Sequence, residues 1–407
     1  MSIINPSGKE IFSVTTELCG RPLTLEVNRV GFRTTGSVLV RYGDTVVLGS
    51  AQVGSRPVQL DYFPLSIDYE ERFYAAGKIS GSRFIKREGR PSDEAVLIGR
   101  LIDRPIRPLF PKGYRQEVQV VATVLSMDPD FRPDVVAMIA ASSALMLTGT
   151  PFDGPVAGLR VGRVNGEFKA FLTPEEREQS DLDLVVAGIA SGITMVEAGA
   201  KEVSEEAIVD AMAWAHQMMQ PAIQLQRELA TKVAPTPQEY ELVLPDEAIQ
   251  QTADEWVDGK LGEKIRRPYP ERNEVVNEIR WAFHEAMAEK LGLGAEEYDE
   301  VRDEYDEAFT LALHKDVRRG IVEDGKRPDG RALTEIRPLS SEVGLLPRAH
   351  GSSLFTRGVT QGMNIVTLAP LSYAQLVDTM EVNDGERRYM HHYNAPGYTV
   401  GEVKRMG

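Results

Sequence analysis

Residues 36–45 read GSVLVRYGDT and residues 351–360 read GSSLFTRGVT, so the two stretches share five residues at an offset of 315 positions. In the first stretch a β-rich run meets Tyr42-Gly43-Asp44, a combination typical of a strand that enters a tight hairpin turn. The sequence therefore predicts a β-hairpin here and a related one 315 positions later.

Two more matches follow the same pattern. Glu71-Arg72-Phe73-Tyr74 falls on Glu386-Arg387-Arg388-Tyr389 at the offset of 315, and the residues from Gly20 to Thr24 match those from Gly330 to Thr334 at an offset of 310. Three matches in order indicate a duplicated domain. The second copy has little chain left before residue 407, so we expect it to be incomplete and the sequence to be part of a longer protein. An unfinished sheet would expose apolar surface and strand edges.

The rest of the first copy mixes strands and helices. Apolar β-rich runs predict strands over residues 118–125, 156–164 and 182–189, with Asn165-Gly166 as a second hairpin turn. Helices are predicted from Ser92 to about residue 102, where Pro105 ends the run, over residues 134–147, and from Ser204 toward residue 221. This pattern indicates an α+β fold. The single cysteine, Cys19, is predicted to be a small buried residue on a strand.

Composition narrows the class of protein. The chain has 407 residues, enough for two or three domains, and its 42% hydrophobic and 26% charged residues are typical of a folded globular protein. Its apolar runs are shorter than a membrane span, and its N-terminus lacks the pattern of a signal peptide. One cysteine excludes an internal disulfide and a multi-cysteine zinc site. We therefore expect a soluble cytoplasmic protein without a membrane partner.

Charge is distributed unevenly along the chain. Residues 236–325 hold 24 acidic and 11 basic side chains, nearly the whole net charge of −15, and their apolar residues recur every three or four positions. This segment is predicted to be an all-helical module whose acidic runs are solvated. Residues 78–112 hold nine basic and four acidic side chains instead. The predicted domains are residues 1–235, the helical linker 236–325, and the start of the second copy at 326–407.

Three stretches carry a family resemblance: DYEERFYAAGKISGSRFIKREGRPSDEAVLIGRLIDRPIRPLF at 68–110, KRPDGRALTEIRPLSSEVGLLPRAHGSSLFTRG at 326–358, and HHYNAPGYTVGEVK at 391–404. With these stretches the whole chain resembles the polynucleotide phosphorylases. The resemblance implies an α+β fold of two RNase PH-like cores (ribosomal protein S5 domain 2-like) joined by an all-α linker, with the second core incomplete here.

The resemblance also implies a function. Such an enzyme is a Mg²⁺-dependent 3′-to-5′ exoribonuclease that takes inorganic phosphate as co-substrate, releases nucleoside diphosphates from single-stranded RNA, and runs backwards to add tails without a template. It acts in mRNA degradation and RNA processing in the cytoplasm, as a homotrimer with partners in an RNA-degradation complex. Joining two anions requires positive charge at the site and in-line positioning of the attacking oxygen.

In that family the catalytic elements are a basic stretch, a serine-rich phosphate loop and two metal-binding carboxylates, and all three are expected after Gly407. No catalytic or metal-binding residue is therefore assigned in this sequence, and the 407-residue chain alone is expected to be inactive. Arg357, Arg387 and Arg388 are the nearest candidates for substrate contact, against the simpler interpretation of surface ion pairing. The alternative is a noncatalytic RNA-binding, ring-forming subunit.

The first copy contains the candidate RNA-binding residues. The stretch SRFIKREGR at 82–90 places Phe84 and Ile85 beside Lys86, Arg87 and Arg90. An aromatic face stacks on a base while cations contact phosphates without reading sequence, which suits single-stranded RNA. By the resemblance this loop lies at the mouth of the RNA channel, where the family usually has a second aromatic in place of Ile85. A solvated basic turn is the alternative.

Overall fold

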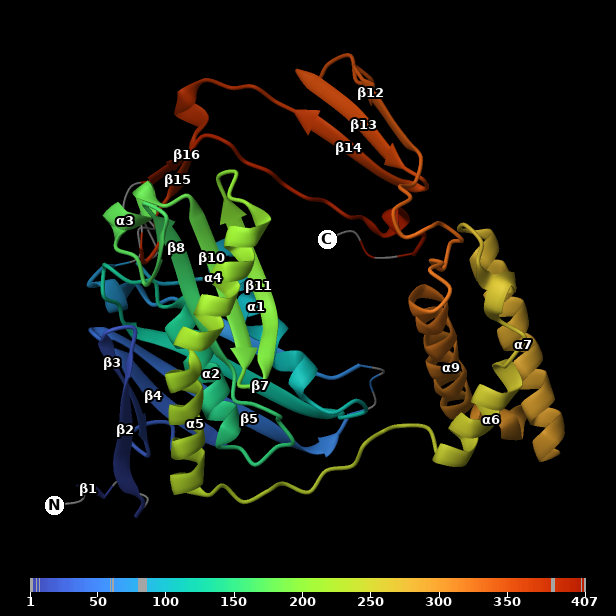
Figure 1. The fold of residues 1–407 in the computed structure, drawn as a ribbon, viewed down its shortest axis with the longest axis horizontal. Helices are drawn as coiled ribbons and strands as arrows, with labels where there is room; N and C mark the ends of the chain where they lie inside the picture. The colour runs from blue at the N-terminus through green and yellow to red at the C-terminus, as the bar shows by residue number, and fades with distance from the viewer. Residues whose placement is uncertain are drawn as a thin grey trace. The chain divides into compact units, whose positions relative to one another are not determined.

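The computed structural model describes residues 3–4, 6, 8–58, 60, 62–79, 86–381, 385–403 and 405. The chain divides into two compact units, residues 1–242 together with 374–407, and residues 243–373 (Figure 1). The predicted domain boundaries after residues 235 and 325 separate two duplicated cores from a linker. The two units are defined by compactness instead, so the predicted boundaries stay predictions.

A seven-stranded sheet forms one layer of the first unit. Its strands, in spatial order, are β1 (Ile3–Ile4), β2 (Glu10–Leu18), β3 (Arg21–Val27), β4 (Gly36–Tyr42), β5 (Thr45–Pro57), β7 (Gln116–Ser126) and β6 (Leu65–Glu70). All neighbours are antiparallel except β6 and β7, which are parallel. The strands predicted from the β-rich runs are therefore confirmed, including the hairpin at Gly43, whose φ of 56° is the left-handed conformation that favours glycine.

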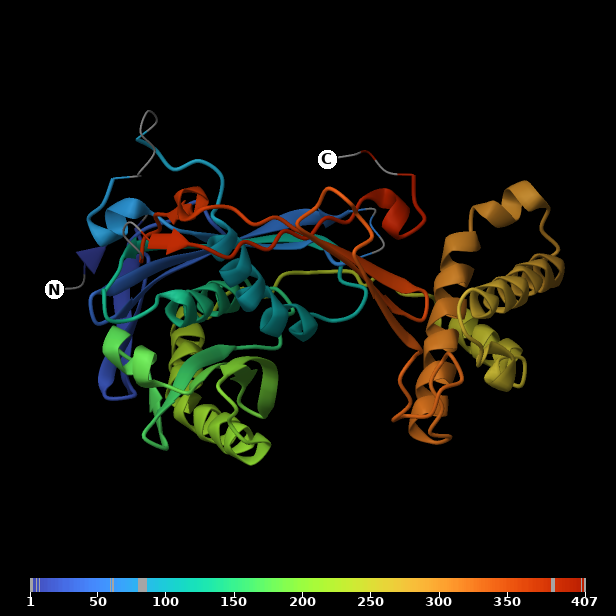
Figure 2. The ribbon, with the colours of Figure 1, turned by 90° about the horizontal axis from the view of Figure 1, so that it is seen from above.

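A second, four-stranded sheet lies on the other side of a buried helix. Its antiparallel order is β11 (Gly192–Ala200), β10 (Leu182–Ile189), β8 (Ala157–Val164) and β9 (Glu167–Ala170). Helix α2 (Asp134–Met146) packs against β4, β5 and β7 of the first sheet and against β8 of the second (Figure 2). Because α2 is covered on both sides, its sequence DVVAMIAASSALM is apolar all round, and even Ser142 and Ser143 are buried.

The remaining helices of this unit begin and end where local signals place them, with one exception. They are α1 (Asp93–Ile106), α3 (Pro174–Gln179), α4 (Glu205–Met218) and α5 (Gln220–Val233), with short 3₁₀ turns η1 (Phe73–Ala76) and η2 (Arg107–Leu109). The Ser92 and Ser204 side chains cap α1 and α4 as predicted. The prediction that Pro105 ends the first helix is wrong: Pro105 lies inside α1, which continues to Ile106, because the φ of proline, fixed at about −65°, is helical and only its own amide bond is lost.

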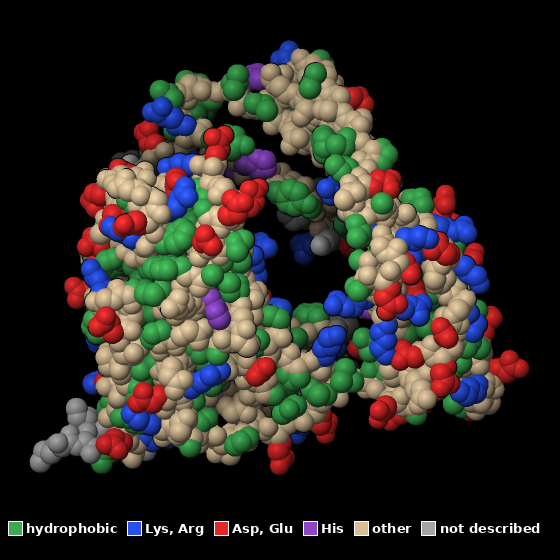
Figure 3. Space-filling view, viewed as in Figure 1, with side chains coloured by type: hydrophobic (Ala, Val, Ile, Leu, Met, Phe, Trp, Pro, Cys, Tyr) green, Lys and Arg blue, Asp and Glu red, His purple; other side chains and the backbone are tan. Residues whose placement is uncertain are grey.

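The predicted helical module is confirmed in the second unit. It consists of α6 (Glu247–Val257), η3 (Gly262–Ile265), α7 (Glu271–Leu291), α8 (Ala295–Asp299) and α9 (Arg302–Val322). Phe283 of α7 and Phe309 of α9 are fully buried with their ring centroids 5.4 Å apart. Acidic and basic side chains are interspersed over the outside of these helices (Figure 3), as expected for solvated helix faces.

The same unit contains the sheet that the repeat predicts. It is antiparallel in the order β12 (Leu339–Val343), β13 (Gly351–Arg357) and β14 (Thr360–Val366), and η4 (Leu371–Tyr373) follows it. Arg357 pairs with Thr360 across the turn, which is the register of Tyr42 and Thr45 moved by 315 positions, and Gly358 has a φ of 60°. Every residue of β12 and β14 is exposed to solvent. The duplicated hairpin is thus confirmed.

The other two repeat matches do not share a local structure. Glu71 precedes η1 and accepts a hydrogen bond from Ser92, whereas Glu386 lies in β16 (Gly385–Arg387), which pairs with β15 (Gln375–Val377). Gly20 and Gly330 both have left-handed φ angles, but β3 begins at once after Gly20 while β12 begins only at residue 339. Identical residues with different hydrogen-bond partners adopt different structures here.

Cys19 is in a turn rather than on the predicted strand. It lies between β2 and β3 with a φ of 49°, and it is half-buried. Burial raises the pKa of its thiol to about 11.

Candidate nucleic-acid interface and polar cavity

The basic segment between η1 and α1 contains cations that are free to meet an anion. Lys86, Arg87 and Arg90 are all exposed, and within the described part of the chain their side chains form no hydrogen bond or ion pair. Phe84 and Ile85, the predicted stacking residues, lie outside the described residues. Three unpaired cations within five positions suit contact with successive phosphates of a single strand.

Two residues tie this segment to the first unit. Before it, Lys78 Nζ donates to the carbonyl oxygens of Thr379 at 3.1 Å and Met380 at 2.9 Å. Within it, between Arg87 and Arg90, Glu88 Oε1 accepts from the Phe73 amide at 3.2 Å, and the amides of Glu88 and Phe73 lower the pKa of the Glu88 carboxyl. Because Glu88 is tied to the first unit, the cations on either side of it are held near one place on its surface.

The later part of the basic stretch is used differently. Arg107 forms a two-point ion pair with Asp103, at 2.7 and 2.9 Å, and also donates to the backbone carbonyls of Phe63 and Leu65 at the start of β6. Arg104 pairs with Glu197 of β11 at 2.6 Å. Arg104 and Arg107 are therefore occupied in holding α1 in place, whereas Arg100 and Lys112 are exposed without a side-chain partner among the described residues. Residues 86–90 differ in that they place three such unpaired cations within five positions.

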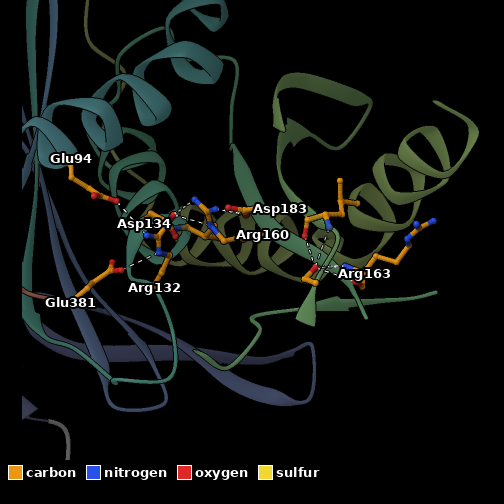
Figure 4. Close-up of polar contacts among 10 residues, drawn as sticks. Glu94, Arg132, Asp134, Arg160, Arg163, Asp183 and Glu381 are labelled. Atoms are coloured by element: carbon orange, nitrogen blue, oxygen red, sulfur yellow. Dashed lines mark hydrogen bonds and ion pairs between the residues drawn. The ribbon is translucent and has the colours of Figure 1, made fainter. Parts of the chain in front are cut away.

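The first unit also has a cavity of about 530 Å³ whose lining includes charged side chains. Figure 4 shows ion pairs that some of these side chains form. Its charged lining residues are Arg132, Asp134, Arg160, Arg177, Asp181, Asp183, Lys201 and Glu381. They come from the loop before α2, from α2, β8, α3, the loop before β10, β10 and the residue after β11, and from the segment after β15.

At the centre of the cavity wall, Arg160 of β8 lies between two carboxylates. Its Nη2 and Nε atoms are 2.7 and 3.1 Å from Asp134 Oδ2, and its Nη1 donates to Asp183. Asp134 is buried at 2% exposure. Burial alone would raise the pKa of this carboxyl, but the Arg160 guanidinium outweighs it and the pKa is lowered. The pair therefore stays ionised inside the fold.

Arg132 joins the segment after β15 to the first core. Its Nε donates to Glu381 Oε2 at 3.0 Å and its Nη2 lies 3.4 Å from Glu94 Oε1 on α1. Burial raises the pKa of the Glu381 carboxyl, and Arg132 opposes that shift. Met380, the residue before it, is fully buried. Residues 379–381 are thus packed and ion-paired against the first core.

The cavity has no excess charge to attract a polyanion. Its lining holds four basic and four acidic side chains, and most of them are paired with one another. Its paired side chains form an ion-pair network of two groups: Arg160 joins α2, β8 and β10, and Arg132 joins α1 to the segment after β15. The sequence did not predict this network because its members are spread along the chain from position 94 to position 381. The one local signal is the charged Asp134 at the start of an apolar helix.

The structure does not bring the three candidate substrate-contact arginines into one unit. Arg387 and Arg388 belong to the first unit and are exposed at the end of β16, whereas Arg357 ends β13 in the second. Among the described residues, no group of three or more His, Cys, Asp or Glu side chains is placed to hold a metal ion.

Comparison with known proteins gives consistent matches. The model of the 3′ exoribonuclease family, domain 1, matches residues 20–151, and that of domain 2 matches residues 154–218. The chain is 47% identical over 399 residues to a polyribonucleotide nucleotidyltransferase of Heliobacterium modesticaldum, covering 98% of this chain and 55% of that protein. Identity is 44% over 400 residues to the protein of the same name from Exiguobacterium sibiricum, covering 98% and 53%. It is 43% over 398 residues to that of Listeria welshimeri, covering 98% and 54%.

The chain spans about half the length of the curated relatives it matches. In the part of the chain that the structure describes, no helix combines the length and the apolar character needed to cross a membrane.

Proposed function

The chain belongs to the 3′ exoribonuclease family, and from that membership we propose that it forms part of a 3′-to-5′ phosphorolytic exoribonuclease, a polyribonucleotide nucleotidyltransferase. Such an enzyme releases nucleoside diphosphates from single-stranded RNA and adds them back in the reverse direction. The observation that carries the proposal is the similarity along 98% of this chain to proteins of that name.

Within this chain, we assign RNA contact to the segment 82–90. The cations of Lys86, Arg87 and Arg90 are exposed and unpaired among the described residues, and two residues hold the chain there, Lys78 before the segment and Glu88 within it. Contacts of this kind bind any sequence, because they meet the phosphates rather than the bases. An enzyme that degrades RNA of any sequence needs contacts with that property.

Inorganic phosphate is the proposed co-substrate and Mg²⁺ the proposed cofactor. When bound, Mg²⁺ would neutralise charge on the reacting phosphates. The described residues do not present a metal-binding group, so no step is assigned to the metal here. The homotrimer, partners in an RNA-degradation complex, the role in mRNA degradation and the cytoplasmic location belong to the same proposal, as does inactivity of the 407-residue chain by itself.

The test is RNA binding and turnover by the purified chain. Fluorescence anisotropy with a labelled oligo(A) would be measured at several salt concentrations, for the wild type and for a Lys86→Ala/Arg87→Ala variant. Each lost phosphate contact lowers the slope of log affinity against log salt by about 0.7 on single strands, so we expect a decrease of about 1.4. An Arg33→Ala/Arg41→Ala variant removes the same charge from exposed positions outside the segment and is expected to keep the slope.

Turnover is measured in parallel as nucleoside diphosphate released from poly(A) with phosphate and Mg²⁺. We expect RNA binding without release from the 407-residue chain, and release from a longer protein that contains it. Equal slopes in the two double variants would contradict the assignment of the segment. Release by the 407-residue chain would contradict the placement of the active site outside it.

A further inference from the structure

Four arginines of the second unit line a small cavity formed by the segment between α9 and β12 and by the end of β13. The cavity has a volume of about 220 Å³ and is lined by Arg327, Arg331, Thr334, Glu335, Ile336, Arg337 and Arg357. It is called the arginine cavity below. All of its lining residues lie within residues 243–373, so the site belongs to one compact unit.

Three of the guanidinium groups are held in place by shared acceptors. Arg327 Nη1 and Arg331 Nη1 donate to the same carbonyl oxygen, that of Glu335, at 3.2 and 2.8 Å. Arg331 Nε and Arg337 Nε donate to the same carboxylate oxygen, Asp329 Oδ2, at 2.8 and 3.4 Å. Cations that share acceptors lie close to one another, and their mutual repulsion is only partly offset.

The fourth arginine has no side-chain partner in the part of the chain that the structure describes. Arg357 is exposed, and no hydrogen bond or ion pair joins its side chain to another residue in the described ranges. It precedes the hairpin turn at Gly358, whose missing side chain matters here: a Cβ at Gly358 would lie 3.0 Å from Arg337 Cδ. The glycine therefore allows Arg337 to pack against the turn next to Arg357.

The charges around the arginine cavity do not balance. Four guanidinium groups face two carboxylates, those of Asp329 and Glu335, which leaves an excess of two positive charges. The Glu335 carboxylate accepts from the Ala332 amide at 3.1 Å, and among the described residues it forms no ion pair with these arginines. Asp329 pairs with two of the arginines, Arg331 and Arg337.

We propose that the arginine cavity binds a phosphate group. Guanidinium groups donate two parallel hydrogen bonds to phosphate oxygens, and the preorganised fork of arginine suits this geometry. The volume of the arginine cavity equals that of about seven waters at roughly 30 Å³ each, which is room for a phosphate group and its remaining water. The group comes from free phosphate, from a nucleotide, or from the end of an RNA. The inference needs no turnover and is independent of the exoribonuclease activity proposed above.

Equilibrium dialysis of the 407-residue chain against radiolabelled inorganic phosphate, without RNA or Mg²⁺, tests the proposal. We expect saturable binding that Arg357→Gln weakens by about tenfold or more, the effect of losing a charge-assisted pair of hydrogen bonds. Arg357→Lys keeps the charge but not the fork and is expected to give an intermediate affinity. Arg348→Gln is the matched control, because Arg348 is exposed in the same unit but does not line the cavity.

Thermal melting of each variant checks that the fold is kept. Absence of saturable binding, or equal weakening by Arg357→Gln and Arg348→Gln, would overturn the proposal. Competition with unlabelled ADP and with an RNA that carries or lacks a terminal phosphate identifies the source. Stronger displacement by ADP assigns the site to a nucleotide, stronger displacement by the phosphorylated RNA assigns it to an RNA end, and displacement by phosphate alone assigns it to the free anion.

Discussion

Replacing Asp134 by Asn removes the most buried charge of the ion-pair network and keeps the shape of the side chain. Asp134 is the first residue of α2, and its Oδ1 accepts from the Val135 amide at 2.7 Å, a bond that asparagine can also accept. Its other oxygen faces Arg160 at 2.7 Å. The substitution therefore leaves Arg160 without its buried partner and disturbs little else.

The cost follows from the burial of the two side chains. The Asp134 side chain is 3% exposed and that of Arg160 is 18% exposed. Removing one member of a buried pair costs about 3–5 kcal/mol, since the remaining charge is left without compensation. Arg160 keeps a second partner in Asp183, whose side chain is 62% exposed. We therefore expect the free energy of unfolding of the first unit to fall by about 3 kcal/mol, the lower end of that range.

Urea denaturation followed by tryptophan fluorescence measures this value. Trp214 packs against Phe168 in the first unit, while Trp256 and Trp281 lie in the second. In a Trp256→Phe/Trp281→Phe background the emission therefore reports on the first unit alone. Asp183→Asn is the matched control: it removes the exposed carboxylate from the same arginine and is expected to cost less than about 1 kcal/mol. Equal costs for the two variants, or a cost of Asp134→Asn within experimental error, would refute the reasoning.

Three further outcomes are expected. The lowered pKa of Asp134 adds stability that is present above the unfolded pKa of about 4 and is lost as the pH falls through the folded pKa. The Asp134→Asn variant should therefore lose less stability on acidification than the wild type. Urea titrations at pH 3 to 6 measure this difference. Gly320→Ala should destabilise the second unit by about 1–3 kcal/mol in urea unfolding, because the new Cβ would lie 1.7 Å from Nη2 of the buried Arg266. This cost is expected despite a gain in helix propensity of about 1 kcal/mol. An unchanged or raised stability would show that Arg266 moves freely. Cys19, with a thiol pKa of about 11, should react with a disulfide reagent at pH 8 about a hundredfold more slowly than a free cysteine, and at a normal rate in urea; a fast reaction of the folded chain would contradict its burial.

Local patterns predicted those parts of the fold that depend on neighbours in sequence. The hairpins at Gly43 and Gly358 were predictable because a tight turn needs a residue with positive φ between two β-rich runs. The starts of α1 and α4 were predictable because Ser92 and Ser204 cap them within three residues. The helical module was predictable because its apolar residues follow the period of a helix over many turns.

Predictions failed where a distant partner decided the local structure. Glu71 and Glu386 share a sequence context, yet Ser92 holds the first and strand β15 pairs with the second. The half-buried position of Cys19 in a turn depends on how β2 and β3 meet. A repeat of a few residues fixes a hairpin, but it does not fix which element lies beside it.

The candidate sites divide in the same way. The cations of Lys86, Arg87 and Arg90 could be found from the sequence, because they are adjacent along the chain; only the structure showed that they are unpaired while Arg104 and Arg107 are not. The arginine cavity contains Arg357, which the sequence had singled out, but its role there depends on three arginines from another segment.

The sequence by itself determined the α+β pattern, the duplicated hairpin, the helical module and the family, because each of these is written in neighbouring residues or in similarity along the chain. The tertiary structure alone decided which charges are paired and which are free. Asp134 and Arg160 are 26 positions apart and Arg132 and Glu381 are 249 apart, so no local pattern relates them. The energy of a charge depends on its burial and on the distance to its partner, and both are properties of the folded chain.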